Sequence, residues 1–563
     1  MEKLSKIKNI IFSFVCKHIE ICTILLLALV FYFIFFYNIG AYPLMDVDET
    51  RYVAMSRDMF RSKDFMTLYL NGHYFFEKPP LYFWQECLSF KLFGGVINEF
   101  SARFPVALLG FVFSFVVYFT SKHWVNRRFG IYTSLILATS LQFIILAKYA
   151  ILDIVLTFYV GLALCCYFAI FFCKENHKKY YRWLFYIFTG LAVMAKGIPG
   201  IAIPVGCVFF ISIFTKKFKE IFKPKYFFVG IVLFCLIVLP WHIYMFKIHN
   251  PLFFREYIIK HHIERFLNSH EIGRKQPFYY YFLILSWGFI PWIFSAITTG
   301  IERIKNQVKN KYYEKYLHFD TLDNTHKLIY MSWICVFWIM LFFSISSTKL
   351  PTYILSVYYP LAIIMGLVWK DYSEQKQHTK AINISVVAVG IFAISASILA
   401  IFTPLFLPKT INCYITDLKT FLSVVLFIFG VCSLIFVKKK FYKGVFCYYV
   451  LLMIVMSAFG TEKFYELDYK FGQNELIEFA QYAQKNNYTI STKGLNRKYS
   501  LLFYNDEPVD YNNKNESVKN VQKDLNKKKN YVILKKKDYE KIEKQLNYKK
   551  VKQGRRYVMI KGF

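Results

Sequence analysis

The sequence predicts a polytopic α-helical membrane protein with a small soluble α/β domain at its C-terminal end. Of the 563 residues, 56% are hydrophobic and 20% are aromatic. Apolar runs of about 17 to 22 residues recur along most of the chain, and this length crosses a hydrocarbon core roughly 30 Å thick. After residue 460 the long runs stop, and charged residues alternate with short apolar stretches. The chain is therefore divided into a transmembrane domain at 1–460 and a soluble domain at 461–563.

Apolar runs and the polar breaks between them predict about thirteen transmembrane helices. They are expected at 19–37, 102–120, 131–147, 152–173, 183–195, 198–214, 226–245, 279–298, 328–346, 352–369, 381–403, 419–437 and 445–460.

The loops between these spans alternate in charge. Loops beginning at 121, 174, 215, 301, 370 and 438 are rich in Lys and Arg, whereas the alternate loops carry few cations. The positive-inside rule then places the N-terminus in the cytoplasm and residues 461–563 on the outer side. The net charge of +34 could suggest a nucleic-acid partner. Basic residues concentrated in short loops between spans are what membrane topology alone requires, so no nucleic-acid partner is expected.

Residues 461–563 contain both helical and strand-like patterns. NELIEFAQYAQ, VKNVQKDL and KDYEKIEKQL have helical spacing, while YTIST, NYVILK and RYVMIKG have the β-branched and aromatic content of short strands. This mixture predicts a small α/β domain. A disordered basic tail is the alternative, but the strand-like stretches are more apolar than disordered segments usually are.

Two long outer loops, 38–101 and 246–278, hold most of the informative polar residues. In the first loop, Asp48, Arg51 and Tyr52 follow helical i, i+3 and i+4 spacing, so their side chains share one face. Ionisable groups at a membrane surface indicate a functional site. The alternative is an ordinary helix start with Asp48 as its cap and a weak surface ion pair.

A second charged cluster in the same loop favours a functional site over an ordinary helix start. Glu77 and Lys78 precede Pro79-Pro80, a rigid step that fixes their direction. Preorganised charge of this kind suits a phosphate-handling site. The apolar stretch after Pro80 is expected to form an amphipathic helix in the membrane interface.

The loop 246–278 adds imidazole and cationic groups. They are His261-His262, Glu264-Arg265 and Gly273-Arg274-Lys275. A His with one Glu can hold a divalent metal whose other positions go to phosphate oxygens or water, so a metal site is one hypothesis for this region.

Further ionisable groups lie at outer span edges: Lys148 with Asp153, Lys196 and Lys349. Such lysines can simply extend to lipid headgroups. Their joint position at the outer leaflet, where topology predicts few cations, favours contact with an anionic lipid headgroup.

These motifs resemble those of the ArnT-like and protein O-mannosyltransferase-like (dolichyl-phosphate-mannose-protein mannosyltransferase) glycosyltransferases with the GT-C membrane fold. The resemblance is carried by DETRY at 48–52, FFEKPPLYFW at 75–84, the Asp153 region, AKG at 195–197, HHIERF at 261–266 and SSTKLPTYILSVYYP at 346–360. It covers the chain to about residue 370, and the remainder is similar in topology alone.

The resemblance implies a GT-C fold and a role for each motif. Asp48 would be the catalytic carboxylate, supported by Arg51 and Tyr52. Lys78 would bind the lipid phosphate, and Glu77 with His262 would hold a divalent metal, most simply zinc. Further phosphate or substrate contacts would come from Arg265, Asp153, Lys196, Lys349 and Tyr353.

Two residues depart from the motifs. Thr50 stands where the DEPRY form has Pro, and Phe75 stands where ArnT-like proteins usually have Tyr. The second change removes a hydroxyl group, which bears on the identity of the donor or the acceptor.

The implied activity is transfer of a sugar from a polyprenyl-phosphate donor to lipid A or another envelope acceptor, at the periplasmic face of a bacterial inner membrane. The sugar would be aminoarabinose-like or another pentose or hexose. Asp48 would act as a general base toward a hydroxyl acceptor and would only orient groups if the acceptor is a phosphate. The alternatives are transfer to protein or glycan hydroxyls and, outside enzymes, a lipid transporter or flippase. A transporter is disfavoured because the charges cluster at span ends and no internal repeat is visible.

Overall fold

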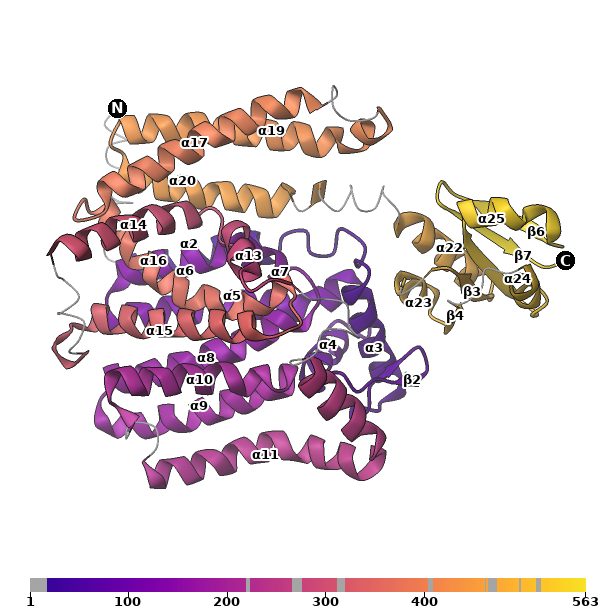
Figure 1. Cartoon of the computed structure of the whole chain (residues 1–563), viewed down its shortest axis with the longest axis horizontal. Coiled ribbons are helices and arrows are strands. Elements are labelled where there is room, and N and C mark those ends of the chain that lie inside the picture. Colours follow the sequence, from indigo (N-terminus) through magenta and orange to yellow (C-terminus); the bar gives the residue numbers. More distant parts are fainter. Residues whose placement is uncertain are drawn as a thin grey trace.

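The computed structural model describes residues 18–218, 223–265, 276–310, 319–403, 409–460, 462–463, 473–495, 498–512 and 518–563. A bundle of long helices forms the body, and a smaller part with a β-sheet projects from one end of it (Figure 1). The helices of the body lie with their long axes close to one direction, which is the arrangement a bilayer imposes.

The helical body follows the predicted spans closely. Its α-helices are α2 (Ile19–Phe35), α5 (Glu99–Trp124), α6 (Arg127–Ala138), α7 (Leu141–Ala147), α8 (Leu152–Phe172), α9 (Glu175–Lys196), α10 (Pro199–Thr215), α11 (Pro224–His249), α13 (Tyr280–Gly288), α14 (Ile293–Asn310), α15 (Asn324–Ile345), α16 (Tyr358–Ser373), α17 (Thr379–Ile401), α19 (Lys409–Lys438) and α20 (Tyr442–Val455). Short 3₁₀ and π segments join or extend them: η2 (Phe254–Glu264), η4 (Phe319–Thr321), η5 (Pro351–Val357) and η6 (Met456–Gly460).

The chain is a multi-span membrane protein. In the described residues, 8 helices are long and apolar enough to cross a membrane, or up to 10 if each of two bent pairs forms one span. The bent pairs are α6 with α7, at 66°, and α13 with α14, at 116°. Helices α2 and α10 are apolar but shorter. Each of the thirteen predicted spans falls on a helix or a helix pair, but the count of thirteen crossings is not confirmed.

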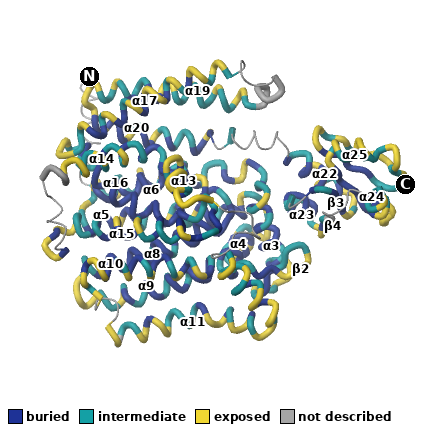
Figure 2. The backbone as a smooth tube through the Cα atoms, viewed as in Figure 1, coloured by how far each residue is buried: buried dark blue, intermediate teal, exposed yellow. Residues whose placement is uncertain are grey.

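The spans differ in how they are surrounded. Helix α8 and the η5–α16 segment are buried over most of their length, whereas α11 and α19 are mostly exposed (Figure 2). An exposed apolar helix in a membrane protein faces lipid rather than water. The core of the body therefore runs along α8 and α16, close to the site described below.

The loop 38–101 folds into four short elements. They are α3 (Asp48–Ser62), the β1–β2 hairpin (Tyr69–Leu70 and His73–Tyr74) and α4 (Leu81–Leu92). Helix α4 begins directly after Pro79-Pro80, as expected, since Pro fits a helix start but not its interior. Helix α5 begins with a capping box in which Asn98 and Ser101 satisfy each other's backbone N–H groups.

The C-terminal part is an α/β unit. Its sheet has the order β4-β3-β5-β7-β6, with β3 parallel to β4 and β5, and β7 antiparallel to β5 and β6. The strands are β3 (Thr489–Lys493), β4 (Val509–Asn512), β5 (Asn530–Lys535), β6 (Lys549–Gln553) and β7 (Tyr557–Lys561). The helices are α22 (Asn474–Lys485), α23 (Ser500–Asn505), α24 (Val518–Leu525) and α25 (Lys536–Ile542), and η8 spans Glu543–Gln545.

Two apolar clusters cover the two faces of this sheet. Ile490, Tyr531 and Met559 pack with α22 and α23, while Val532, Val558 and Ile560 pack with α24 and α25. Because both faces of the sheet are covered, β5 and β7 are buried at nearly every position, which fits the β-branched and aromatic content that predicted them as strands. The disordered-tail alternative is wrong for the described part of this region.

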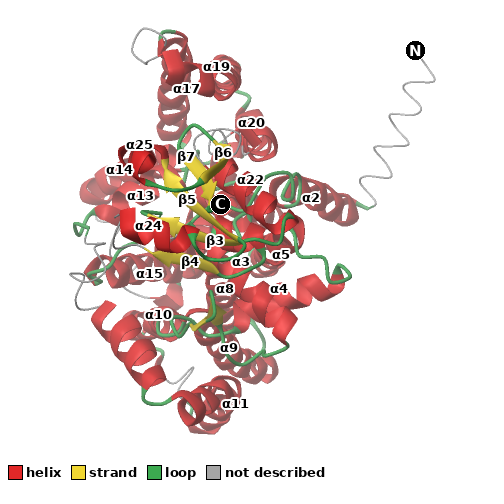
Figure 3. Cartoon of the chain, turned by 90° about the vertical axis from the view of Figure 1, so that its right-hand side faces the viewer, coloured by secondary structure: helices red, strands yellow, loops and turns green. Residues whose placement is uncertain are grey.

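The C-terminal part docks on α3 and its neighbours, and both lie at the same end of the bundle (Figure 3). Arg57 of α3 donates to the carbonyl oxygens of Leu502 and Phe503 and pairs with Asp506 at 2.9 Å. Asn71 exchanges two hydrogen bonds with the backbone of Val509. The loop 38–101 and the C-terminal part are thus one packed unit.

Candidate active site

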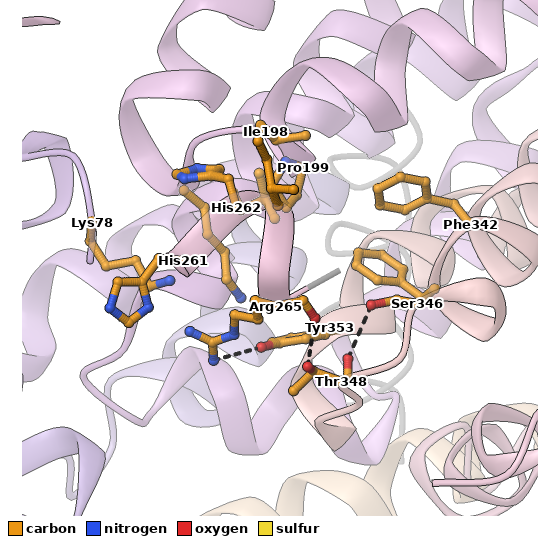
Figure 4. A pocket seen from close by; sticks show the side chains of 14 residues that line it. Lys78, Ile198, Pro199, His261, His262, Arg265, Phe342, Ser346, Thr348 and Tyr353 are labelled. Atoms are coloured by element: carbon orange, nitrogen blue, oxygen red, sulfur yellow. Dashed lines mark hydrogen bonds between the residues drawn. The ribbon is translucent and has the colours of Figure 1, made fainter. Parts of the chain in front are cut away.

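A pocket of about 390 Å³ lies where the loop 38–101 meets the ends of several helices (Figure 4). Its walls combine cations with apolar side chains. The lining residues are Lys78, Leu156, Lys196, Ile198, Pro199, His261, His262, Ile263, Arg265, Phe342, Phe343, Ser346, Thr348 and Tyr353. Three cations on an apolar wall suit an anionic head attached to a hydrophobic chain.

Arg265 holds the polar side of this pocket together. Its Nη2 donates to the hydroxyl oxygen of Tyr353 at 3.0 Å, and its Nη1 lies 4.0 Å from Glu77 Oε2. The carbonyl oxygen of Arg265 accepts a hydrogen bond from Thr348 Oγ1 at 2.6 Å, which fixes its backbone (Figure 4). Although burial acts against its charge, Tyr353 and Glu77 raise the pKa of Arg265, so the guanidinium stays charged.

Lys78 enters the pocket from the turn before Pro79-Pro80, and its amine lies beside His261 in Figure 4. Burial lowers the pKa of Lys78 to about 7, and the charge of Arg265 acts in the same direction. An incoming phosphate would reverse both effects by supplying a counter-charge. The residue is therefore poised to gain or lose its proton near neutral pH.

Asp48, Arg51 and Tyr52 converge as the helical spacing predicts. Arg51 Nη2 donates to Asp48 Oδ1 at 2.8 Å and to the Tyr52 hydroxyl oxygen at 3.0 Å. The guanidinium also lies over the ring of Phe75, 5.8 Å from its centroid. Although burial opposes the charge, Tyr52, Glu77 and Asp48 raise the pKa of Arg51.

Glu77 connects these three residues to the pocket. Although burial opposes its ionisation, the nearby charge of Arg51 lowers the pKa of this carboxyl, so it is ionised at neutral pH. Glu77 is thus coupled electrostatically to Arg51 of the first cluster, and its Oε2 lies 4.0 Å from Nη1 of Arg265 in the pocket wall.

Lys196 and Asp153 form a nearly buried ion pair at the end of α9. Lys196 Nζ donates to Asp153 Oδ1 at 2.6 Å and lies 4.5 Å from the ring centroid of Tyr353. The sequence grouped Asp153 with Lys148, but Lys148 instead donates to the carbonyl oxygens of Tyr37 and Ser457. Lys148 therefore has a role in joining helices rather than in the pocket.

His262 is held against the turn between α9 and α10. Its Nδ1 is hydrogen-bonded to the carbonyl oxygen of Tyr257. Gly197, the glycine of AKG, has φ +73°, and a Cβ at this position would lie 2.2 Å from His262 Nε2. A side chain at position 197 would occupy the space of the His262 imidazole, so this close contact requires glycine.

The residues predicted to hold a metal are Glu77 and His262. Within the described ranges, no group of three or more His, Cys, Asp or Glu side chains is arranged to hold a metal ion. The imidazole within 4 Å of Glu77 is that of His261, whose Nε2 lies 3.9 Å from Glu77 Oε1. The metal ligands Glu77 and His262 remain a prediction.

One further part of the predicted site does not line the pocket, and another falls outside the described residues. Lys349 donates to the carbonyl oxygen of Ser346 at 2.6 Å and is not among the lining residues, so it stabilises the turn whose Ser346 and Thr348 do line the pocket. Gly273, Arg274 and Lys275 lie outside the described residues.

Comparison with known proteins agrees with this architecture. A family model for dolichyl-phosphate-mannose-protein mannosyltransferases matches residues 20–254. ArnT from Cupriavidus metallidurans, crystallised bound to undecaprenyl phosphate, superposes with a TM-score of 0.75 at 20% identity, covering 96% of this chain and 97% of that one. The chain has the GT-C fold of the ArnT-like glycosyltransferases.

Several curated relatives agree with this ArnT-like assignment. An undecaprenyl phosphate-α-4-amino-4-deoxy-L-arabinose arabinosyl transferase of Yersinia enterocolitica is 28% identical over 369 residues, 64% of this chain and 61% of that protein. A protein of the same name from Wigglesworthia glossinidia brevipalpis is 30% identical over 379 residues, 65% of this chain and 59% of that protein. An uncharacterised Aquifex aeolicus protein is 29% identical over 355 residues, 63% of this chain and 64% of that protein. The chain spans about three fifths of the length of these relatives.

This ArnT-like chain also contains a buried ion pair that sequence reasoning missed. Glu49 accepts two hydrogen bonds from Arg103, at 2.7 and 2.8 Å, and both side chains are fully buried. Arg103 lies at the start of a predicted apolar span, and a lone Arg in such a place signals a buried carboxylate partner. Glu49 thus anchors α3 to α5, while its neighbour Asp48 pairs with Arg51.

Proposed function

We propose that the protein is a membrane glycosyltransferase that moves a sugar from a polyprenyl-phosphate donor to lipid A or another envelope acceptor. The observation that carries the proposal is the pocket in which Lys78, Lys196 and Arg265 meet beside apolar walls. A lipid phosphate would place its charge among the cations and its isoprenoid units against Phe342, Phe343 and their neighbours.

The chemistry that this chain can supply follows from its charges. A lipid phosphate is already a good leaving group, so the site has to hold it and stabilise the negative charge that grows as the sugar departs. Lys78 and Arg265 would hold the phosphate oxygens. Tyr353 would keep the guanidinium of Arg265 directed toward them.

Asp48 is proposed as the carboxylate that acts on the acceptor. For a hydroxyl acceptor it would take the proton as oxygen attacks the anomeric carbon, an effect on the order of 100 to 10,000-fold in rate. For a phosphate acceptor, which is already anionic, it would only orient Arg51 and the sugar. The names of the relatives support an aminoarabinose donor.

A divalent metal, with zinc as the predicted ion, belongs to the same proposal. Glu77 with His262, or with the nearer His261, would provide its ligands. Bound there, the metal would contribute positive charge toward the phosphate. Metal analysis of the purified chain, with Glu77→Gln as comparison, tests this part alone.

The setting proposed for this reaction is the outer face of a bacterial inner membrane. The N-terminus would lie in the cytoplasm and the C-terminal part in the periplasm, as the charge asymmetry of the loops indicates. A cysteine introduced at residue 538 or at residue 320 and labelled from the periplasmic side would distinguish this orientation from the inverse orientation.

The decisive test is transfer by the purified full chain. Undecaprenyl phosphate-linked 4-amino-4-deoxy-arabinose and lipid A would be supplied, and the mass of lipid A measured. The proposal expects a mass increase of one sugar with the wild type and none with Asp48→Asn, while Asp320→Asn, an exposed acid, stays active. Transfer by Asp48→Asn at the wild-type rate would remove Asp48 from the mechanism.

The second candidate function is transfer to protein or glycan hydroxyls from the same kind of donor. The match to the family model of protein mannosyltransferases favours it. Unmodified lipid A together with a labelled protein or glycan fraction would support this alternative.

A further inference from the structure

Asp46, two residues before the first motif, links α3 to the C-terminal part. Its Oδ1 accepts a hydrogen bond from the backbone N–H of Ser500 at 2.7 Å, and its Oδ2 accepts one from Ser500 Oγ at 2.7 Å. The side chain of Asp46 is only 4% exposed. A carboxylate buried to this degree needs its hydrogen bonds, so the contact is specific rather than incidental.

The same carboxylate reaches into the first turn of α3. Thr50 Oγ1 donates to Asp46 Oδ1 at 2.9 Å, and the Thr50 N–H donates to the carbonyl oxygen of Met45 at 3.2 Å. Thr50 lies between Asp48 and Arg51 in the chain. Hydrogen bonds therefore run from Ser500 through Asp46 to the turn that carries the proposed catalytic carboxylate.

Two more residues of the C-terminal part hold the same stretch. Gln473 accepts a hydrogen bond from the Asp46 N–H at 3.2 Å and donates to the carbonyl oxygen of Leu44. Lys498 Nζ lies 3.7 Å from Asp46 Oδ2. The segment just before Asp48 is thus fixed by groups more than four hundred residues away in sequence.

Thr50 is also the position where this chain departs from the DEPRY form of the motif. A Pro at this place would have neither a hydroxyl nor an N–H group. Both of the hydrogen bonds that Thr50 donates would be lost. Thr50 therefore makes hydrogen bonds that Pro, the more usual residue, cannot make.

We propose that the C-terminal part positions Asp48 and Arg51 through the Ser500–Asp46–Thr50 hydrogen bonds. Asp46 and Thr50 are positioning residues of the site, and they act through α3 rather than on substrate. This inference rests on the proposed function and adds a task for the C-terminal part.

The kinetic test compares Thr50→Val, Asp46→Asn and Ser500→Ala in the purified full chain with the donor and lipid A named above. Thr50→Val keeps the shape of the side chain and removes its hydroxyl. We expect a kcat about threefold to tenfold lower with the donor KM unchanged, since one hydrogen bond is lost and the pocket is untouched. In the double variant Asp46→Asn with Thr50→Val, kcat should fall no further than it does in the single variant with the larger loss of kcat.

Asp506→Asn is the matched control. It weakens the contacts of Arg57 and Arg61 further along α3, within the same interface, and leaves residues 44–50 intact. Its kcat should equal that of the wild type. An equal loss in this control, or full additivity in the double variant, would mean that docking in general matters and would overturn the specific link.

Amide hydrogen exchange supplies a readout that does not depend on sugar transfer. Residues 44–52 should exchange faster in Ser500→Ala than in the wild type, and at the wild-type rate in Asp506→Asn. If the wild type transfers no sugar, the proposed function fails while the exchange result still stands. If the wild type is active, and Thr50→Val and Ser500→Ala keep full kcat or wild-type exchange, the positioning role is overturned.

Discussion

The guanidinium of Arg265 and the hydroxyl of Tyr353 lie 3.0 Å apart, and this hydrogen bond joins the end of η2 to the turn that precedes α16. Tyr353 also presents its ring to Lys196 at 4.5 Å. One phenol therefore orients a cation through its oxygen and attracts another through its π-face. The positions of Arg265 and Lys196 relative to each other therefore depend on both the ring and the hydroxyl of Tyr353.

Replacing Tyr353 by Phe should separate these two contributions. The ring and its contact with Lys196 remain, while Arg265 loses a hydrogen bond worth about 1 kcal/mol. We expect undecaprenyl phosphate to bind about threefold to tenfold more weakly in a titration with the purified chain. Tyr330→Phe, on the far part of α15, serves as control, and equal affinities for all three proteins would exclude a role for the hydroxyl.

Binding of the lipid phosphate should weaken as the pH rises above 7. Lys78 has a pKa of about 7 in the empty pocket, so below this pH it is already charged, and above it binding requires uptake of a proton. The affinity for undecaprenyl phosphate should fall by up to tenfold per pH unit between pH 7 and 9. Burial lowers the pKa of both His261 and His262 to about 4, so neither titrates in this window.

Lys78→Arg tests the origin of that pH dependence. An Arg side chain stays charged throughout the range, so the affinity of this variant should change little between pH 7 and 9. A variant that retains the wild-type slope would show that some other group is titrating.

Much of the fold could be predicted from the sequence because bilayer physics leaves few choices. The apolar runs predicted the helices of the body, and Pro79-Pro80 predicted the start of α4. The strands β3, β5 and β7 were recognisable from their β-branched and aromatic residues, whereas β4 and β6 were missed. The strand β6 carries Lys at three of its five positions and is an edge strand, where apolar patterning is weak.

The candidate site was predictable only in part. Helical spacing was enough to bring Asp48, Arg51 and Tyr52 together. Contacts between distant segments could not be derived, because they depend on how loops pack. The pairing of Asp153 with Lys196 rather than Lys148 is one example, and the contact between Asp46 and Ser500 is another.

Lys196 and Asp153 should stabilise the fold only when both members of the ion pair are present. Asp153→Asn leaves a buried cation without its counter-charge, a change that typically costs about 3 to 5 kcal/mol. The apparent Tm in detergent should drop by several degrees. The double variant with Lys196→Gln should recover most of that loss but not the affinity for undecaprenyl phosphate, and a double variant as unstable as the single one would contradict this account.

Gly197→Ala should disturb His262. The residue has φ +73°, which is unfavourable for Ala, and its Cβ would collide with the imidazole. Strain of this kind costs on the order of 1 to 3 kcal/mol, so we expect a lower apparent Tm and weaker lipid binding. Gly300→Ala is the control, since a Cβ there meets nothing within 4 Å, and matching losses in both variants would argue against the contact with His262.

The most direct measurement of the central claim compares undecaprenyl phosphate with undecaprenol in binding to the purified full chain at pH 6.5. If Lys78, Lys196 and Arg265 hold the phosphate, the phosphorylated lipid should bind at least about tenfold more tightly, a preference worth about 1.4 kcal/mol or more. Lys78→Met should remove most of that preference. Equal binding of the two lipids by the wild-type protein would contradict the assignment of the pocket.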